Sequence, residues 1–419
     1  MRKRGAFTLV EMLVSVALTL FIMVLLSQAF AAGLQAFRQM KALGDMEERL
    51  RSTSTILRRD LTAFHFENVR KLSDPNFWST TYGGGPPAQG FFRIWQGVAS
   101  TQEGTDGDGI QSFRATSHML NFTCKLLGLG PDDFASAYLP PSLAAANPPI
   151  TTPNLYGSNT CDTRFIAQSQ AQSLYRSRWF EVAYFLRPSG LTAGSSVPLF
   201  TLYRRQLTVV NPAPPIAPTT STSSFSWPDY YQLSCNLPNL NAGTSVTFNK
   251  PSMLTMPARR FAMATATTSP TNYLAGIPSD SVNSVITYPC LGETATLPAN
   301  QVPIFWQDNT SYNGSDVLLS DVISFEISVL TADNPAHFSD LFHQTNFTGS
   351  NSAFTTSGPM VFDTWSSQND GTYNYSGWAS SGTYTSAPMQ LHIQAVKIII
   401  RVWDNKTRQA RQVTVLQDM

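Results

Sequence analysis

One acidic residue stands at the start of a long apolar run, and it is the side chain of this sequence best placed to do chemistry. Glu11 follows Phe7-Thr8-Leu9-Val10 and precedes an uncharged stretch from Met12 to Leu26. On insertion scales a carboxylate at the bilayer centre costs roughly 2.5–3.5 kcal/mol. A charge is tolerable there when an opposite charge pairs with it in the same low dielectric. The position of Glu11 in this run therefore needs an explanation.

Four cysteines form the next candidate group: Cys124, Cys161, Cys235 and Cys290. None of them forms a C-x-x-C pair, which argues against zinc and thioredoxin chemistry. In an exported chain, four well-spaced cysteines allow two disulfides with three possible connectivities. The alternative is four free, partly buried thiols.

Metal and catalytic motifs are sparse. Asp106 and Asp108 lie in an acidic, glycine-rich stretch and could share a calcium ion, but further ligands and a closing acid are missing. The alternative is a hydrophilic turn. His337 and His343 are six apart, which is not a zinc spacing. No H-E-x-x-H, G-x-S-x-G or P-loop occurs, so we expect no cofactor and no enzymatic activity.

The composition suits a loop-rich extracytoplasmic β domain. Charged residues make up 13% of the 419 residues, and aromatic residues make up 11%, enough to build a core. Lys and Arg (28) balance Asp and Glu (27), which leaves a net charge of +1. This charge gives no electrostatic reason to expect nucleic acid as a partner.

The N-terminal segment is long and apolar enough to span a bilayer. A basic block, Arg2-Lys3-Arg4, precedes the run, and a less apolar segment continues to Phe37. The positive-inside rule keeps the block cytoplasmic and places the rest of the chain outside the cytoplasm. A cleaved signal peptide is the alternative, because Ala29-Phe30-Ala31 fits an A-x-A cleavage site.

The helical pattern does not stop at Ala31. Pairs at i, i+4, Asp45/Arg49 and Glu47/Arg51, lie opposite an apolar stripe. Pro75 and the run Gly83–Pro87 end the pattern. We predict one helix over about residues 8–68, with a lipid half and an amphipathic half whose stripe packs on another element. The stripe contains Leu34, Phe37, Met40, Leu43, Met46, Leu50, Leu57, Leu61 and Phe64.

Phe7-Thr8-Leu9-Val10-Glu11, after a short basic leader and before an apolar helix, resembles the N-terminus of type IV pilins and type II secretion pseudopilins. The resemblance implies that a prepilin peptidase removes the leader and N-methylates the new first residue. It also implies that the acid at the fifth mature position pairs with the N-terminal amine of a neighbouring subunit.

The cleavage site departs from the family pattern. The family usually has Gly before the cut, but cleavage between Gly5 and Ala6 would make Glu11 the sixth residue. Cleavage between Ala6 and Phe7 makes Glu11 the fifth, with Ala6 in place of the usual Gly. We favour this second register, with Phe7 as the methylated residue.

A second resemblance covers the next part of the helix. Glu48-Arg49-Leu50-Arg51 and Ile56-Leu57-Arg58-Arg59-Asp60-Leu61 are similar to the membrane-distal helix of J-type minor pseudopilins and W-type minor pilins. The segments -VAYFL- and -LYRR-, within 179–210, resemble the central hairpin of the same proteins. The alternative is a solvated charged face with a leucine seam. Asp60 has no visible partner for general acid–base work.

Strand patterns dominate the remainder. Predicted strands are 91–95, a hairpin of 179–186 with 199–210, then 317–319 with 322–330, 395–403 and 412–416. The expected fold is α+β, a long helix packed on an antiparallel β-sheet head. The expected division is a leader (1–6), a transmembrane helix (7–37), an amphipathic helix (38–70) and a head (71–419) with loop insertions near 131–160, 211–226 and 333–388.

These observations predict an assembly protein: a minor pilin or pseudopilin held in the inner membrane by a single span, with its head periplasmic or extracellular. The expected partners are other pilin or pseudopilin subunits, the prepilin peptidase, the inner-membrane assembly platform and the membrane. An alternative is a binding module at a filament tip, an adhesin or DNA-uptake protein, on the same anchor. An exported enzyme would need a catalytic constellation that we do not find.

Overall fold

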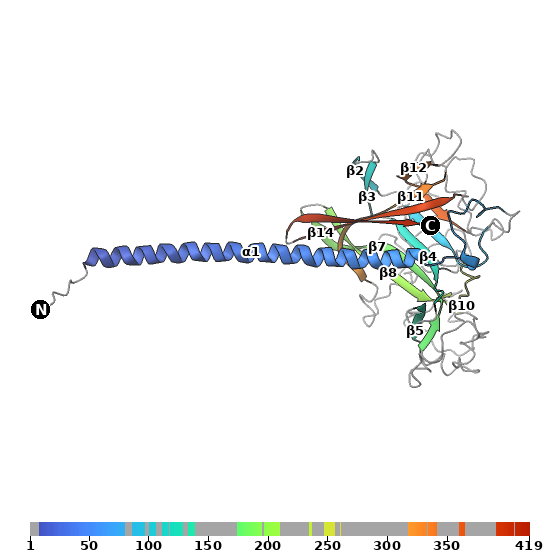
Figure 1. Cartoon of the computed structure of the whole chain (residues 1–419), viewed down its shortest axis with the longest axis horizontal. Helices are drawn as coiled ribbons and strands as arrows, with labels where there is room; N and C mark the ends of the chain where they lie inside the picture. The colour runs from blue at the N-terminus through green and yellow to red at the C-terminus, as the bar shows by residue number, and fades with distance from the viewer. Residues whose placement is uncertain are drawn as a thin grey trace, which may run out of the picture.

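The computed structural model shows one long helix whose end lies against a β-rich head (Figure 1). It describes residues 8–79, 86–96, 100–105, 111–116, 118–128, 133–138, 174–194, 197–209, 234–236, 247–255, 260, 317–332, 334–341, 360–364, 391–405 and 407–419. The predicted fold class, a helix packed on an antiparallel sheet, is confirmed.

Helix α1 (Leu9–Thr62) is continuous over 54 residues, about 80 Å at 1.5 Å per residue. It ends six residues before the predicted boundary at 68. Ala63 adopts extended backbone angles, and Phe64 forms an antiparallel bridge with Lys125. The chain therefore leaves the helix by joining the sheet, a tertiary pairing that helical periodicity cannot reveal.

The described part of the head contains fifteen strands and one 3₁₀ turn. They are η1 (Glu67–Val69), β1 (Phe92–Gln96), β2 (Ser100–Thr105), β3 (Gln111–Ala115), β4 (Met119–Lys125), β5 (Ala135–Tyr138), β6 (Leu174–Ser177), β7 (Trp179–Ala193), β8 (Val197–Thr208), β9 (Cys235–Asn236), β10 (Thr247–Phe248), β11 (Val317–Thr331), β12 (Asn334–Ser339), β13 (Met360–Asp363), β14 (Ile393–Asp404) and β15 (Gln409–Asp418).

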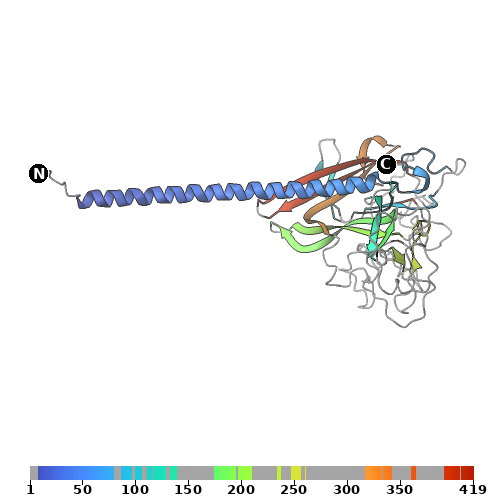
Figure 2. The same ribbon diagram turned by 60° about the horizontal axis from the view of Figure 1, so that its bottom comes forward.

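The main sheet has nine strands in the order β13-β1-β4-β7-β8-β11-β14-β15, with β12 added beside β11. All of its pairings are antiparallel. The end of α1 lies along this sheet, with the rest of the helix projecting away from the head (Figures 1 and 2). The head is therefore carried at one end of a straight rod.

The predicted strands are present, but two segments differ from expectation. Strand β7 continues to Ala193, beyond the predicted end at residue 186, because the β7–β8 pairing resumes after a register shift between Pro188 and Thr192, where Gly190 adopts a positive φ. The span 333–388, expected as a loop insertion, supplies β12 and β13 to the main sheet.

The membrane-distal half of α1 and the inner face of the sheet form one core. Met46, Leu50, Leu57 and Leu61 are buried together with residues of the sheet, as predicted for this part of the stripe. The same core cluster contains, from the main sheet, Val182, Leu202, Val322, Ile327, Ile398, Ile400 and Val415. Burying both apolar faces against each other fixes the helix to the head.

Candidate functional site

The N-terminus of α1 is closed by a capping box built from Thr8 and Glu11. The Thr8 hydroxyl accepts the Glu11 backbone N–H at 3.3 Å, and the Thr8 backbone N–H donates to Glu11 Oε2 at 2.9 Å. The Thr8 hydroxyl also donates to Oε2 at 3.0 Å. A carboxylate is stabilised at a helix N-terminus because free backbone N–H groups and the helix dipole favour negative charge.

Glu11 retains acceptor capacity beyond this box. Its bonds use Oε2, and among the described residues Oε1 has no partner. A carboxylate can accept about four hydrogen bonds. The side chain is exposed at the start of the apolar run, so a group from outside the described chain can reach it. The predicted cleavage residues Gly5, Ala6 and Phe7 lie outside the described residues.

The first part of α1 is apolar and uncovered. One helix in the described part of the chain, α1, is long and apolar enough to cross a membrane, and its most apolar window has no buried residue. Leu9, Phe21 and Leu26 are among the exposed side chains. This surface cannot be stable in water, which is consistent with a lipid or protein environment around it.

From about residue 30 onward, the apolar stripe of α1 divides in two. Phe30, Leu34 and Phe37 are 70%, 41% and 65% exposed, whereas Leu57 is fully buried. At about 100° per residue, Phe30, Leu34 and Phe37 lie roughly 180°, 140° and 160° around the helix from Leu57. We call these three residues the outward face, because they point away from the side on which the head packs.

The opposite side of the same turns is less apolar and carries glutamine and alanine. By the same rotation, Gln39 falls in line with Leu57, and Gln35 lies within about 40° of it. The stripe winds around the helix because Leu34, Phe37, Met40, Leu43 and Met46 follow at steps of three, each short of a 3.6-residue turn. The stripe is therefore two surfaces, one packed on the head and the other uncovered.

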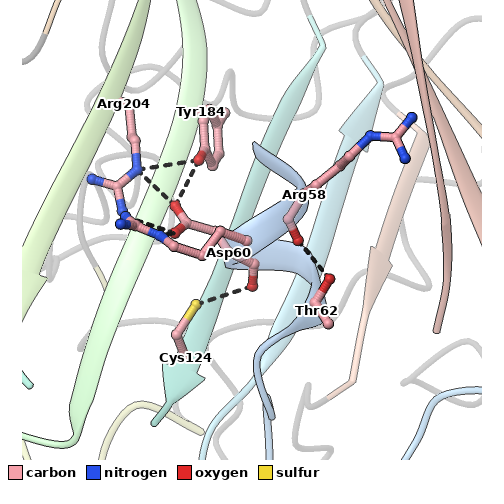
Figure 3. A network of polar contacts seen from close by, with 7 residues as sticks. Arg58, Asp60, Thr62, Cys124, Tyr184 and Arg204 are labelled. Carbon is pink, nitrogen blue, oxygen red and sulfur yellow. Dashed lines mark hydrogen bonds and ion pairs between the residues drawn. The ribbon is translucent and has the colours of Figure 1, made fainter. Parts of the chain in front are cut away.

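A second acid of α1 lies at the head end of the helix, in a buried polar network (Figure 3). Asp60 is 1% exposed, and Arg204 of β8 donates from Nε to its Oδ2 at 2.6 Å. The Tyr184 hydroxyl of β7 donates to the same oxygen at 2.6 Å, and Arg204 Nε also reaches that hydroxyl at 3.1 Å. We call Asp60, Tyr184 and Arg204 the Asp60 network.

Two further groups border the Asp60 network. The exposed Arg59 side chain approaches Asp60 Oδ1 at 3.4 Å, and the Cys124 thiol donates to the Asp60 backbone carbonyl at 3.4 Å. Arg58 points away from the network, on the other side of the helix (Figure 3). The Asp60 network therefore joins one side of α1 to β7 and β8, and the bordering Cys124 adds a contact from β4.

Arg204, Tyr184 and the bordering Cys124 each keep one protonation state over the ordinary pH range. Burial alone would lower the pKa of Arg204, but the Asp60 carboxylate and the Tyr184 hydroxyl raise it overall, so the guanidinium stays charged. Burial and then Asp60 raise the pKa values of Tyr184 and Cys124, which keeps both groups neutral donors. The arrangement is an ion pair with a hydroxyl donor.

Sequence reasoning left Asp60 without a partner, and the structure supplies two. Arg59-Asp60-Leu61, -VAYFL- and -LYRR- meet here, since Tyr184 lies in the second segment and Arg204 in the third. The available signal was a charged residue at a seam position of the helix, where Asp60 interrupts a leucine pattern.

Most of the other predicted site residues lie outside the part of the chain that the structure describes. Cys124 is a free, buried cysteine in this structure. Cys161, Cys290 and the side chain of Cys235 lie outside the described residues, so their pairing stays a prediction. Asp106, Asp108 and His343 also lie outside them, and His337 is exposed on β12. Among the described residues, no group of three His, Cys, Asp or Glu side chains is arranged to hold a metal ion.

Comparison with known families adds one finding. A model of the prokaryotic N-terminal methylation motif matches residues 1–27, the stretch that contains Glu11 and most of the apolar run. No curated protein and no solved structure matches the chain. The motif implies processing by a prepilin peptidase, assembly with pilins, and a membrane-anchored protein with an extracytoplasmic head. The chain thus carries the prepilin-type methylation motif of pilins and pseudopilins at its N-terminus, and its fold is a pilin-like α+β fold.

Proposed function

We propose that this protein is a minor pilin or pseudopilin that enters or primes a filament of the type IV pilus or type II secretion class. The observation that carries the proposal is the outward face, an uncovered apolar surface on the side of α1 away from the head. A subunit with such a surface can bury it only against another helix or lipid. The methylation motif at residues 1–27 favours the helix of a neighbouring subunit.

In this proposal, prepilin peptidase cleaves between Ala6 and Phe7, and Phe7 is N-methylated. Residues 7–37 hold the protein in the inner membrane, 38–70 join the anchor to the head, and 71–419 form the extracytoplasmic head. The large head favours a low-copy position near the filament tip. The meeting of the J-type and W-type segments in the Asp60 network supports assignment to that subclass.

Glu11 has a defined role in assembly. Its carboxylate forms a salt bridge with the N-terminal amine of a neighbouring subunit. Oε1 is the oxygen that the capping box leaves available for this salt bridge. In a low dielectric both charges gain from the pairing, which removes the cost of the acid in lipid. The same acid in an isolated anchor would be a net cost.

Mass spectrometry of the mature N-terminus tests processing. The expected first residue is N-methyl-Phe7; a mature N-terminus at Phe30 or Ala32 would show a signal peptide and contradict the proposal. Glu11→Gln tests assembly and should lower filament incorporation strongly. Glu48→Gln is the matched control, because Glu48 is an exposed acid on the same helix outside the apolar run. If both variants were incorporated into filaments equally well, the proposed pairing role of Glu11 would be contradicted.

A further inference from the structure

The apolar seam between α1 and the head does not by itself define where the helix lies. Its members Met46, Leu50, Leu57 and Leu61 are spaced by four, seven and four residues, or one and two turns. A shift by one turn, about 5.4 Å, would put Met46 at the place of Leu50 and Leu57 at that of Leu61, and a single polar residue, Thr53, would enter the seam at the place of Leu57. Repetitive apolar seams in helical assemblies need a polar residue to select one register.

Asp60 is the one charged residue among the buried residues of α1. Its short side chain places the carboxylate against two partners, the Arg204 guanidinium and the Tyr184 hydroxyl, each at 2.6 Å. These partners sit on adjacent strands, β7 and β8, which pair Tyr184 directly with Arg204. A slip of one turn or a rotation of the helix would separate the Asp60 carboxylate from the Arg204 guanidinium and leave both charges buried without their partner.

We infer that the Asp60 network sets the axial and rotational register of α1 on the head, and that this register aims the outward face away from the head. The inference deepens the proposed function and rests on it for the role in assembly. Asp60 is a positioning residue here, since its effect on assembly passes through the helix. In a straight helix a rotation at Asp60 reaches Phe37, about 35 Å away, undiminished.

A purely stabilising role makes a different prediction. Replacing a buried ion pair with apolar residues of similar volume is often neutral or stabilising, whereas removing one partner leaves an unpaired charge. An all-apolar replacement therefore separates the two roles. If the network sets register, such a replacement keeps the stability of the head but lets the helix occupy more than one position.

The test uses the full chain in detergent micelles with the triple variant Asp60→Leu, Tyr184→Phe, Arg204→Met. Spin labels on Glu48→Cys and Thr414→Cys, both exposed positions, report the distance between helix and head by electron paramagnetic resonance. The chain without these two cysteines gives the background from native thiols. With the network intact we expect one narrow distance distribution. In the triple variant we expect a broadened or split distribution at an unchanged thermal midpoint.

Two outcomes would overturn the inference. One is a triple variant with a single narrow distribution; the other is broadening that occurs only together with a lowered midpoint. Arg204→Lys provides a second test if the triple variant does not fold, because it keeps the charge and loses the planar guanidinium. It should broaden the distribution, and a wild-type distribution there would also overturn the inference. Arg59→Gln, at the exposed edge of the network, should change nothing.

Filament incorporation separates this inference from the proposed function. The triple variant should incorporate several-fold less than wild type, and Phe37→Ser, which alters the outward face with the network intact, should do the same. Normal incorporation of Phe37→Ser would reject the proposed function, while the distance distributions would still decide the register. Normal incorporation of the triple variant with a broadened distribution would reject the link between register and assembly.

Discussion

The two halves of α1 carry similar residues in opposite circumstances. The half outside the head has exposed apolar side chains and an acid, Glu11, whose partner within the described chain is its own cap residue Thr8. The half within the head has a buried apolar seam and an acid, Asp60, paired with Arg204 and Tyr184. In the second half, the fold itself buries the apolar seam and pairs the acid. In the first half, no described part of the chain covers the apolar side chains.

This difference separates stability from assembly along one helix. Changes in the head half should alter the free energy of unfolding, because its groups are buried with fixed partners. Changes in the outer half should leave that free energy nearly unchanged and alter interactions between molecules. Four experiments test this division, given in order of decreasing expected effect.

Asp60→Ala should have the largest effect on stability. It leaves the Arg204 guanidinium and the Tyr184 hydroxyl buried without their carboxylate, and breaking a buried pair in this way costs about 3–5 kcal/mol. Chemical denaturation of the full chain in micelles, followed through tryptophan fluorescence, measures the loss. Glu11→Ala is the comparison in the outer half and should leave the head's denaturation midpoint in place. Equal losses would mean that the two halves are not separate.

Leu57→Ala should also destabilise the head, by about 2–5 kcal/mol, because it opens a cavity at a fully buried position. Phe37→Ala removes a larger side chain from the outward face, yet it should change the free energy of unfolding by less than about 0.5 kcal/mol. The same denaturation measurement compares them. A large loss for Phe37→Ala would show that the outward face is covered within the monomer.

Acid should destabilise the head through a buried histidine at its junction with α1. Burial lowers the pKa of His65 to about 4, against hydrogen bonds to the Thr123 and Leu61 carbonyls and the nearby Asp60 charge, which raise it. Below pH 6.5 His65 binds a proton in the unfolded chain, whereas in the folded chain it binds one only below about pH 4. The free energy of unfolding therefore falls as the pH drops from 6.5 to 4. The total loss is on the order of a few kcal/mol.

The difference between wild type and His65→Gln isolates this contribution. Two other groups titrate in or near this pH range. Burial lowers the pKa of His118 to about 3, so its protonation also destabilises the folded head in acid. Burial, with Asp340, raises the pKa of Glu326 to about 7, so its protonation stabilises the folded head as the pH drops. Denaturation at several pH values should show wild type losing stability relative to His65→Gln between pH 6.5 and 4. A flat difference would mean that His65 is not buried as a neutral group.

Thr8→Ala should have the smallest effect. Loss of an N-cap costs about 1 kcal/mol, and here it falls on the first turn of α1 alone. Amide hydrogen exchange should increase over the first turn, with the head's exchange unchanged. Ser15→Ala is the control, because the Ser15 hydroxyl donates to the Met12 carbonyl and caps nothing. Faster exchange in the head would couple the two halves.

Local sequence signals predicted much of the architecture. The 3.6-residue pattern indicated one helix from lipid into the head, and the alternation of Val396, Ile398, Ile400 and Val402 indicated a half-buried strand, now β14. Both signals are local, because periodicity reports which face of an element is buried. They failed at Phe64, where pairing with Lys125 ends the helix, and in 333–388, whose strands β12 and β13 join distant partners.

The sequence by itself determined the anchor, the position of Glu11 within it and the order of helix and strands, because each depends on neighbours in the chain. Only the tertiary structure decided that Asp60 meets Arg204 and Tyr184, 144 and 124 positions away, and that the apolar stripe divides between the head and an outward face. The physical reason is that a buried charge is defined by the groups that surround it in space, and their positions depend on strand order and register.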